Sequence, residues 1–333
     1  MGRTSIVAAV AIGVLAVAGC SGGGDGAPVD RQPTPAQPEA APVKGTIGLS
    51  VLTLTNPFFK EIADTVTAEA EKYGFTVHVE SGDFDVVQQQ HQVKNFIVEK
   101  VSVIVLTPCD SKAIGPAIQE ANQAGIPVFT ADIACLAPGA KVVSHIATDN
   151  YQGGRLAAKA LLEAIGGKGK VAILDHPMVE SVMLRTKGFH DELAEAASRP
   201  DVDIEVVATL PGGGAKDVSF KAAQDLLQAH PELDAIFAIN DPSALGAVAA
   251  LEEAGKLDRV KVIGFDGQPE GKAAIKAGSI YADPVQFPDQ IGRKTVEAIM
   301  NYLEGEEVPA EILIPTSLYR QADAQQDPAV AGP

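Results

Sequence analysis

The chain has 333 residues, with 26 basic and 43 acidic side chains and a formal net charge of −17 at pH 7. This length suffices for two domains of ordinary size, each with its own core. The basic residues form no cluster, so the positive surface that nucleic-acid binding requires is missing, and we expect no DNA or RNA partner.

The first twenty residues contain Arg3, a short apolar run from Ile6 to Ala18 and the sequence VAGC, which ends at Cys20. The run is too short for an ordinary spanning helix, and small residues before the cysteine suit a signal peptidase. The segment resembles a bacterial lipoprotein signal. It predicts a signal peptide over residues 1–19, lipid attachment at Cys20 and an extracytoplasmic protein anchored to the cell membrane. A plain secretory signal or a weak anchor is the alternative.

Residues 20–43 form a Gly- and Pro-rich segment almost without large apolar side chains. Such a segment cannot bury enough apolar surface to offset the entropy lost on ordering, so we expect a disordered tether. The tether is expected to hold a folded part away from a membrane.

Short β-branched runs alternate with helical stretches from Lys44 onward. Continuous apolar runs are typical of strands buried on both faces, and strand–helix alternation indicates parallel pairing with right-handed crossovers. The pattern predicts a doubly wound α/β domain. Its strands are expected at 46–54, 76–80, 101–107, 126–131 and 141–148, and its helices at 58–73, 86–99 and 112–124.

The same alternation restarts at Tyr151 and predicts a second α/β domain of similar build. Its helices are expected at 151–165, 182–197, 216–229 and 242–254, and its strands at 170–175, 203–210, 234–239 and 260–266. The last part of the chain contains a strand near 279–286, a helix near 288–304 and a strand near 311–314. These pieces are too few for a third core, so we expect them to complete the first two domains by crossing between them.

Polar and aromatic residues follow the predicted strands, at the edge where ligands bind in open parallel sheets. They are Asn56, Phe58, Phe59, Asp110, Asp132, Asn240, Asp241, Asp266 and Gln286. Carboxylates and carboxamides can bridge neighbouring hydroxyls, and an aromatic ring can cover the C–H side of a sugar, so the set predicts a small polyhydroxylated ligand. Capping and turn formation are the alternatives for the Asn and Asp residues, and core packing is the alternative for the phenylalanines.

Sequence signatures of enzymes are missing. The glycine-rich stretch at 211–217 lacks the spacing of a phosphate loop, no GxGxxG follows the first strand, and GxSxG, HExxH and EF-hand patterns do not occur. The histidines are scattered and the cysteines lack zinc-site spacing. We therefore expect a protein that is not an enzyme and that uses neither a cofactor nor a metal.

Longer motifs extend in order from Thr46 to about Tyr319. They are TNPFF (55–59), ANQAGIPVFTAD (121–132), VVSHIATDNYQGG (142–154), RTKGF (185–189), AHPELDAIFAINDPSALGAVAALEEAG (229–255), VIGFDGQPEG (262–271) and QFPDQIG (286–292). These motifs resemble the ribose-type (type I) periplasmic sugar-binding proteins, which are the extracytoplasmic receptors of ABC importers.

The resemblance implies two doubly wound Rossmann-like lobes joined by a three-segment hinge, with ligand trapped in the cleft as the lobes close. The crossings are expected near 147–150, 284–288 and 314–317. The expected N-terminal lobe comprises 44–147 plus 287–315, the C-terminal lobe 148–286 plus 316–322, and a disordered tail 323–333.

The resemblance also implies a set of sugar-contacting positions. They are Asn56, Phe58, Phe59, Asp132, Asn240, Asp266 and Gln286. The ribose-binding relatives have arginines where this chain has Ile133 and Met183, a serine where it has Leu52, and an aromatic ring within 212–214 where it has glycines. The donors expected for ribose are therefore not reproduced, and we expect another small sugar or polyol. Glu180 and His176 are candidates for new polar contacts, and solvated side chains are the alternative.

Cys109 and Cys135 follow neighbouring strands of the first predicted sheet, at the same edge. Thiols of exported proteins are commonly bridged, and the spacing of adjacent strands permits a bridge between their loops, so we expect a disulfide. Two separate buried thiols are the alternative.

The family resemblance predicts a monomeric, lipid-anchored solute-binding protein that delivers its ligand to an ABC importer permease. A ligand-sensing receptor that signals to a chemotaxis or kinase partner is the main alternative. A LacI-type repressor needs a helix-turn-helix and a basic surface in the place where this chain has a signal and a tether. An exported hydrolase is the remaining rival, which turnover of a bound sugar would reveal.

Overall fold

The structure, a computed structural model, describes residues 44–330. The expected signal peptide, tether and lipidated Cys20 lie outside these residues. Within 44–330, no helix combines the length and the apolar character that a membrane span requires.

Two six-stranded sheets form the framework, in the orders β11-β5-β4-β3-β1-β2 and β12-β10-β9-β8-β6-β7. The first consists of β1 (Gly45–Val51), β2 (Phe75–Ser81), β3 (Val103–Leu106), β4 (Val128–Ala131), β5 (His145–Thr148) and β11 (Glu311–Ile314). The second consists of β6 (Lys168–Asp175), β7 (Asp203–Pro211), β8 (Ala235–Ala238), β9 (Lys261–Ile263), β10 (Ala282–Val285) and β12 (Ser317–Arg320). Among these strands, β10 and β12 form the antiparallel pair, and the other pairings are parallel.

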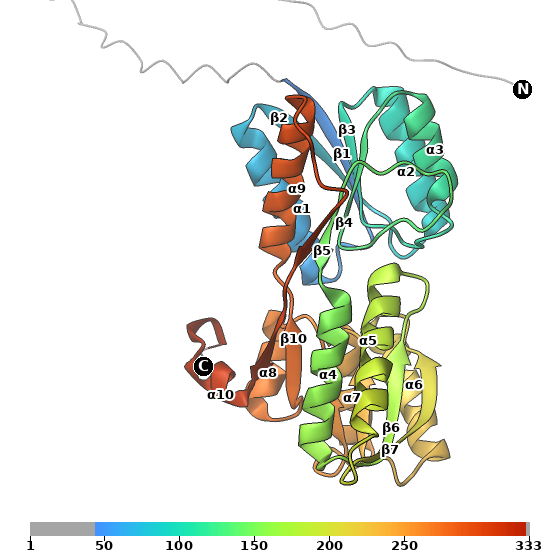
Figure 1. Cartoon of the computed structure of the whole chain (residues 1–333), viewed down its shortest axis with the longest axis vertical. Helices are drawn as coiled ribbons and strands as arrows, with labels where there is room; N and C mark the ends of the chain where they lie inside the picture. The colour runs from blue at the N-terminus through green and yellow to red at the C-terminus, as the bar shows by residue number, and fades with distance from the viewer. Residues whose placement is uncertain (1–43, 331–333) are drawn as a thin grey trace, which may run out of the picture. The chain divides into compact units, whose positions relative to one another are not determined.

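Helices cover both faces of the first sheet. One face packs against α1 (Pro57–Lys72) and α9 (Pro288–Leu303), and the other against α2 (Val86–Glu99) and α3 (Gly115–Gln123). Helices α1 and α9 lie side by side although more than two hundred residues separate them in the chain (Figure 1). The C-terminal part of the chain therefore completes the first lobe, as the sequence predicts.

The second sheet is covered in the same way. Helices α4 (Asn150–Ile165) and α5 (Glu180–Ala196) pack on one face, and α6 (Lys216–Ala229), α7 (Asp241–Glu253) and α8 (Pro269–Ala277) pack on the other. The buried strands are continuous apolar runs, as in β3, where all four residues are buried. This pattern follows from helices on both faces, which leave a strand no solvent-facing side.

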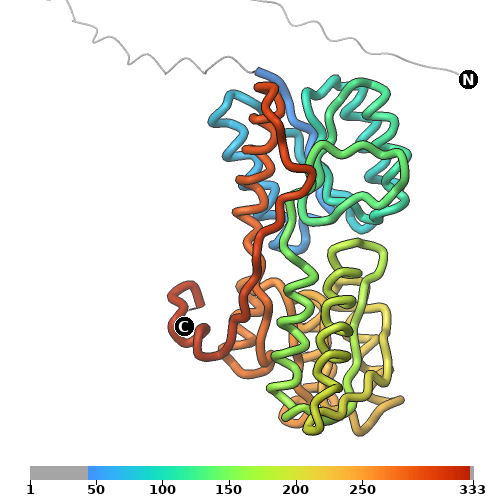
Figure 2. The backbone as a smooth tube through the Cα atoms, viewed as in Figure 1, coloured from blue at the N-terminus to red at the C-terminus, as the bar shows by residue number. Residues whose placement is uncertain are grey.

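The chain passes between the two sheets three times (Figure 2). The passages run from β5 to α4, from β10 to α9 and from β11 to β12. The predicted fold class, two doubly wound lobes joined by three segments, is confirmed. We refer to the lobe of the first sheet as the N-terminal lobe and to that of the second as the C-terminal lobe.

The prediction of a disordered tail from residue 323 is wrong for residues 323–330. These residues belong to α10 (Gln321–Gln326) and η1 (Pro328–Val330), which pack against α8. The Lys276 ammonium donates to the backbone oxygen of Val330 at 2.6 Å, and Lys272 forms an ion pair of 3.2 Å with Asp327. Polar contacts to lysines of α8 hold this segment in place. Because the segment itself contains few apolar residues, its sequence gives no indication that it is ordered.

The predicted disulfide is also wrong, because Cys109 and Cys135 are both free thiols. The Cys109 thiol points toward the backbone oxygen of Leu52 at 3.7 Å and belongs to the core beneath α1. Cys135 packs against the core beneath α2 and α3. The two side chains therefore serve opposite faces of the sheet, and a bridge requires Cβ atoms that face each other.

Candidate ligand-binding site

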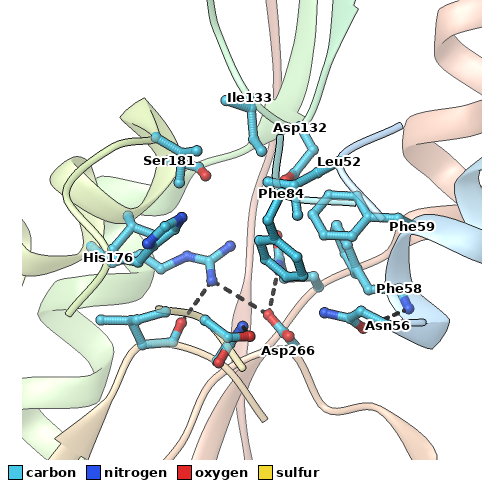
Figure 3. Close-up of a pocket in the computed structure, with 17 residues that line it drawn as sticks. Leu52, Asn56, Phe58, Phe59, Phe84, Asp132, Ile133, His176, Ser181 and Asp266 are labelled. Carbon is cyan, nitrogen blue, oxygen red and sulfur yellow. Dashed lines mark hydrogen bonds and ion pairs between the residues drawn. The ribbon is translucent and has the colours of Figure 1, made fainter. Parts of the chain in front are cut away.

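A cavity lies between the two lobes at the carboxyl ends of their strands (Figure 3). All the sugar-contacting positions that the family resemblance implies line it. These are Asn56, Phe58, Phe59, Asp132, Asn240, Asp266 and Gln286. The cavity volume, counted as the space in which the centre of a water molecule can lie, is about 40 Å³. One water needs roughly 10–15 Å³ on this scale, so the free space holds only a few waters and suits a small ligand.

Phe58 and Phe59 both line the cavity, and both are also core residues. Their rings meet edge to face, with centroids 5.2 Å apart and planes at 85°. Asn56 fixes their position because its side-chain oxygen accepts a hydrogen bond of 3.0 Å from the Phe58 N–H and so caps α1. The cap turns the start of the helix so that neighbouring rings face one cavity.

Asp266 accepts two hydrogen bonds at the same carboxylate oxygen. Gln286 donates from Nε2 at 2.6 Å, and Arg185 donates from Nη1 at 3.4 Å. Burial raises the pKa of Asp266 to about 6, while Arg185 and the Gln286 hydrogen bond act in the opposite direction. The Oε1 atom of Gln286 is buried without a hydrogen-bond partner among the described residues, so it remains able to accept from a ligand.

Arg185 lines the cavity and is held there by several contacts. Its Nε donates to Asn150 Oδ1 at 2.8 Å, its Nη1 donates to the backbone oxygen of Ile239 at 2.7 Å, and its guanidinium stacks 3.9 Å from the Phe265 ring centroid. Close packing of α4 and α5 sets this position, because a Cβ at Gly154 would lie only 2.0 Å from the backbone oxygen of Arg185. These contacts fix the guanidinium before a ligand arrives.

Asp132 is 2% exposed, and its Oδ1 has no hydrogen-bond partner within residues 44–330. Burial raises its pKa to about 7, with Asp266 and Glu180 adding to the rise and Arg185 opposing it. The backbone is left-handed at Asp132, with φ 63°, and also positive at Asp266, with φ 107°. Such backbone is costly for residues with a Cβ and is typical of binding sites, where it aims a side chain.

Asn240 lines the cavity, but both ends of its carboxamide are already engaged. Its Oδ1 accepts from the Ser243 N–H at 2.9 Å, which caps α7, and its Nδ2 donates to the backbone oxygen of Gly214 at 3.0 Å. The capping alternative considered for this residue is therefore realised. A ligand contact at Asn240 would share these groups.

Asp110 and Asp241, which also follow predicted strands, do not line the cavity, and neither does Glu180. It opens α5, its backbone N–H donates to the Ser111 hydroxyl of the N-terminal lobe at 2.9 Å, and burial raises the pKa of its carboxyl group. The side chain interacts with the backbone of Ala134 and not with the cavity. Glu180 thus belongs to the contact between the lobes.

Sequence reasoning missed several lining residues, among them Phe84 and Arg185. Phe84 has φ 63° and presents its ring to His176 of the other lobe, with centroids 6.4 Å apart. It follows β2, so the strand-edge rule applied to β2 would have found it. Arg185 lies inside α5, beyond the reach of that rule, although it begins the RTKGF motif.

His176, considered in the sequence as a possible polar contact, does line the cavity. Its Nε2 is buried without a partner among the described residues, and burial lowers its pKa. Within residues 44–330, no group of three or more His, Cys, Asp or Glu side chains is placed to hold a metal ion.

Comparisons with known proteins agree with this geometry. The family model described as "Periplasmic binding protein domain" matches residues 47–307. The ribose import binding protein RbsB of Escherichia coli K12 is 39% identical over 271 residues, which cover 81% of this chain and 89% of that protein.

Two solved ABC transporter solute-binding proteins are similar in structure. The protein from Actinobacillus succinogenes 130z, with bound D-allose, has a TM-score of 0.77 and 31% identity, covering 85% of this chain and 100% of that one. The protein from Mycobacterium smegmatis, with bound glycerol, has a TM-score of 0.77 and 30% identity, covering 85% and 96%. This chain therefore belongs to the periplasmic binding protein family, among the ribose-type sugar-binding proteins of ABC importers.

Proposed function

We propose that this protein captures a small sugar or polyol by closure of its two lobes and delivers it, as a monomer, to the permease of an ABC importer. The observation that carries the proposal is the pair of buried carboxylates, Asp132 from the N-terminal lobe and Asp266 from the C-terminal lobe, on one cavity. Ligand hydroxyls can bridge such acceptors only when the lobes are together, so binding favours closure.

The apolar lining supports the same class of ligand. The rings of Phe58, Phe59 and Phe84 offer faces and edges to the C–H groups of a small carbohydrate. The polar groups of the site are few and are held in position by other residues, as in sites that orient a small molecule. The named functions of the relatives, ribose import for the E. coli protein and ABC transport for the solved structures, favour an importer over a signalling partner.

Ribose itself is not the ligand that this site fits best. Ile133 and Leu52 line the cavity with aliphatic side chains, at positions where the resemblance to the ribose-binding proteins implies an arginine and a serine. Gly214 also lines it and belongs to the glycine stretch 212–214, within which the same resemblance implies an aromatic ring. The M. smegmatis structure, with bound glycerol, supports a polyol as an equally suitable candidate.

A thermal-shift screen tests the proposal. The mature protein is screened against pentoses, hexoses, tetritols and pentitols, and a ligand at a hundredfold excess over its dissociation constant should add about 2.7 kcal/mol of stability. The recovered ligand should be chemically unchanged, because the proposal includes no catalysis. If no sugar or polyol, with or without an amino group, shifts the transition, the proposal fails.

Attachment to the membrane is a separate part of the proposal. The lipoprotein-like signal supports a lipid on Cys20 and an extracytoplasmic location. In a lipoprotein-processing host, the full chain should fractionate with membranes, and a Cys20→Ala variant should not. Equal fractionation of both would contradict the anchor and leave the binding function untouched.

A further inference from the structure

The charges that face the cavity do not balance. Two carboxylates, Asp132 and Asp266, line it, and Arg185 is the lining residue with a permanent positive charge. Arg185 pairs with Asp266 at 3.4 Å. Asp132 takes part in no ion pair within residues 44–330, although it is 2% exposed. One buried negative charge is therefore left without a counter-charge.

The surroundings of Asp132 do little to solvate that charge. Leu52 and Ile133 lie on the same side of the cavity as Asp132, while Asp266 lies on the opposite side (Figure 3). The other charged groups that influence Asp132 are Glu180 and Asp266, which repel its negative charge, and Arg185, which attracts it from beyond ion-pair distance. An isolated buried carboxylate is strongly disfavoured unless a proton or a cation neutralises it.

The side-chain atoms left free for a ligand include more hydrogen-bond acceptors than donors. Asp132 Oδ1 and Gln286 Oε1 are buried hydrogen-bond acceptors without partners among the described residues. His176 Nε2 is buried and unpartnered as well, and burial lowers its pKa, so this ring favours the neutral form and does not supply the missing charge. An ammonium group offers three N–H donors and one positive charge, which matches what the cavity lacks.

We propose that the ligand class of this cleft is a small polyhydroxylated amine, an amino sugar or amino polyol, whose ammonium group pairs with Asp132. The proposal rests on the proposed function, because it names the ligand of that same site. Hydroxyls of the ligand meet Asp266, Gln286 and Arg185, while its nitrogen meets Asp132.

The test compares matched pairs of probes that differ by one amine for one hydroxyl. Calorimetric titrations at pH 7.5 use 2-amino-1,3-propanediol against glycerol, D-glucosamine against D-glucose, and 1-amino-1-deoxy-D-glucitol against D-glucitol. In at least one pair the amine is expected to bind about 10- to 100-fold more tightly, the range of a buried charge-assisted contact. The preference should shrink at pH 5, because Asp132 then binds a proton.

Two variants assign the preference to Asp132. Asp132→Asn keeps the shape and removes the charge, so the ratio of amine to neutral affinity should fall toward one. Ile133→Arg places a guanidinium next to Asp132 and should remove the same preference by supplying the missing charge from the protein. Asp201→Asn, at an exposed ion pair with Arg199, is the control and should leave the ratio unchanged.

The outcomes separate this inference from the function beneath it. If neutral sugars or polyols bind and no amine binds more tightly than its partner, the amine proposal is overturned and the sugar-binding function stands. If an amine preference exists but persists in Asp132→Asn, the proposal is overturned as well. If no probe and no neutral sugar of the screen binds, the proposed function itself fails.

Discussion

The Ser111 hydroxyl in the N-terminal lobe accepts a hydrogen bond of 2.9 Å from the backbone N–H of Glu180 in the C-terminal lobe. The Ser111 N–H donates to the backbone oxygen of Met178 at 3.0 Å, so the same residue makes a second bond across the lobes. These bonds form only when the lobes are together, and they stabilise the closed conformation at the edge of the cavity.

Ser111→Ala should weaken ligand binding about 2- to 10-fold, since one net hydrogen bond contributes about 0.5–1.5 kcal/mol. The loss should fall mainly on the dissociation rate, because the bond forms after the ligand is enclosed. Stopped-flow and titration measurements with an identified ligand check this. Ser144→Ala is the control, as its hydroxyl donates to Pro309 within the N-terminal lobe. Equal effects of the two variants on affinity would mean that the Ser111 contact does not stabilise the closed lobes.

Arg185→Ala should lower the free energy of unfolding by about 3–5 kcal/mol at pH 8, because it leaves the Asp266 carboxylate buried and unpaired. The loss should be smaller at pH 5, since the pKa of Asp266 is raised already and rises further without Arg185. Urea denaturation at both pH values measures it. The double variant with Asp266→Asn should recover part of the loss; strictly additive effects would argue against the pairing.

Asp132→Asn should stabilise the ligand-free protein at pH 8 by roughly 2–4 kcal/mol. Burial raises the pKa of Asp132 to about 7, above its value in an unfolded chain. Between about pH 4 and 7 the folded state thus binds more protons than the unfolded state, and the free energy of unfolding falls as pH rises. Denaturation at pH 4 and pH 8 should show little difference between variant and wild type at the lower pH. A variant that is less stable at pH 8 would contradict the burial argument.

Cys109 and Cys135 should remain reduced in the exported protein. Both should react with an alkylating reagent after unfolding without a reductant, and dithiothreitol should leave the melting temperature unchanged. Burial raises the pKa of both thiols, so reaction in the folded state should be slow. An intact mass lower by two hydrogen atoms, together with a melting temperature that reductant lowers, would show that the two cysteines form a disulfide after all.

Much of the fold could be predicted from the sequence because strands buried on both faces require continuous apolar runs. Strand β3 and helices α2 and α6 occur almost where the pattern places them. Helix α8 was missed because it buries only Gly271 and Ile275 and so has little apolar periodicity. Strand β12 and α10 were missed because their order depends on contacts with distant parts of the chain.

The candidate site was predictable where one local rule applied. Residues that directly follow parallel strands, such as Asp132 and Asp266, meet at the same edge. The rule did not find Arg185 because this residue lies on helix α5 and not directly after a strand. The close packing of Gly154 against its backbone sets where its side chain reaches the cavity. The sequence wrongly predicted Glu180 as a cavity residue. Its backbone at the start of α5 is bound to Ser111 of the other lobe, and no local sequence pattern encodes that contact.

Calorimetric titration of the identified ligand into Asp132→Ala and Asp266→Ala is the most direct test of the central claim that both lobes share one binding site. The account predicts at least a hundredfold loss of affinity in each variant, although the two residues belong to different lobes, while both variants keep a cooperative unfolding transition. Wild-type affinity in either variant would show that the ligand contacts one lobe only and would contradict the account.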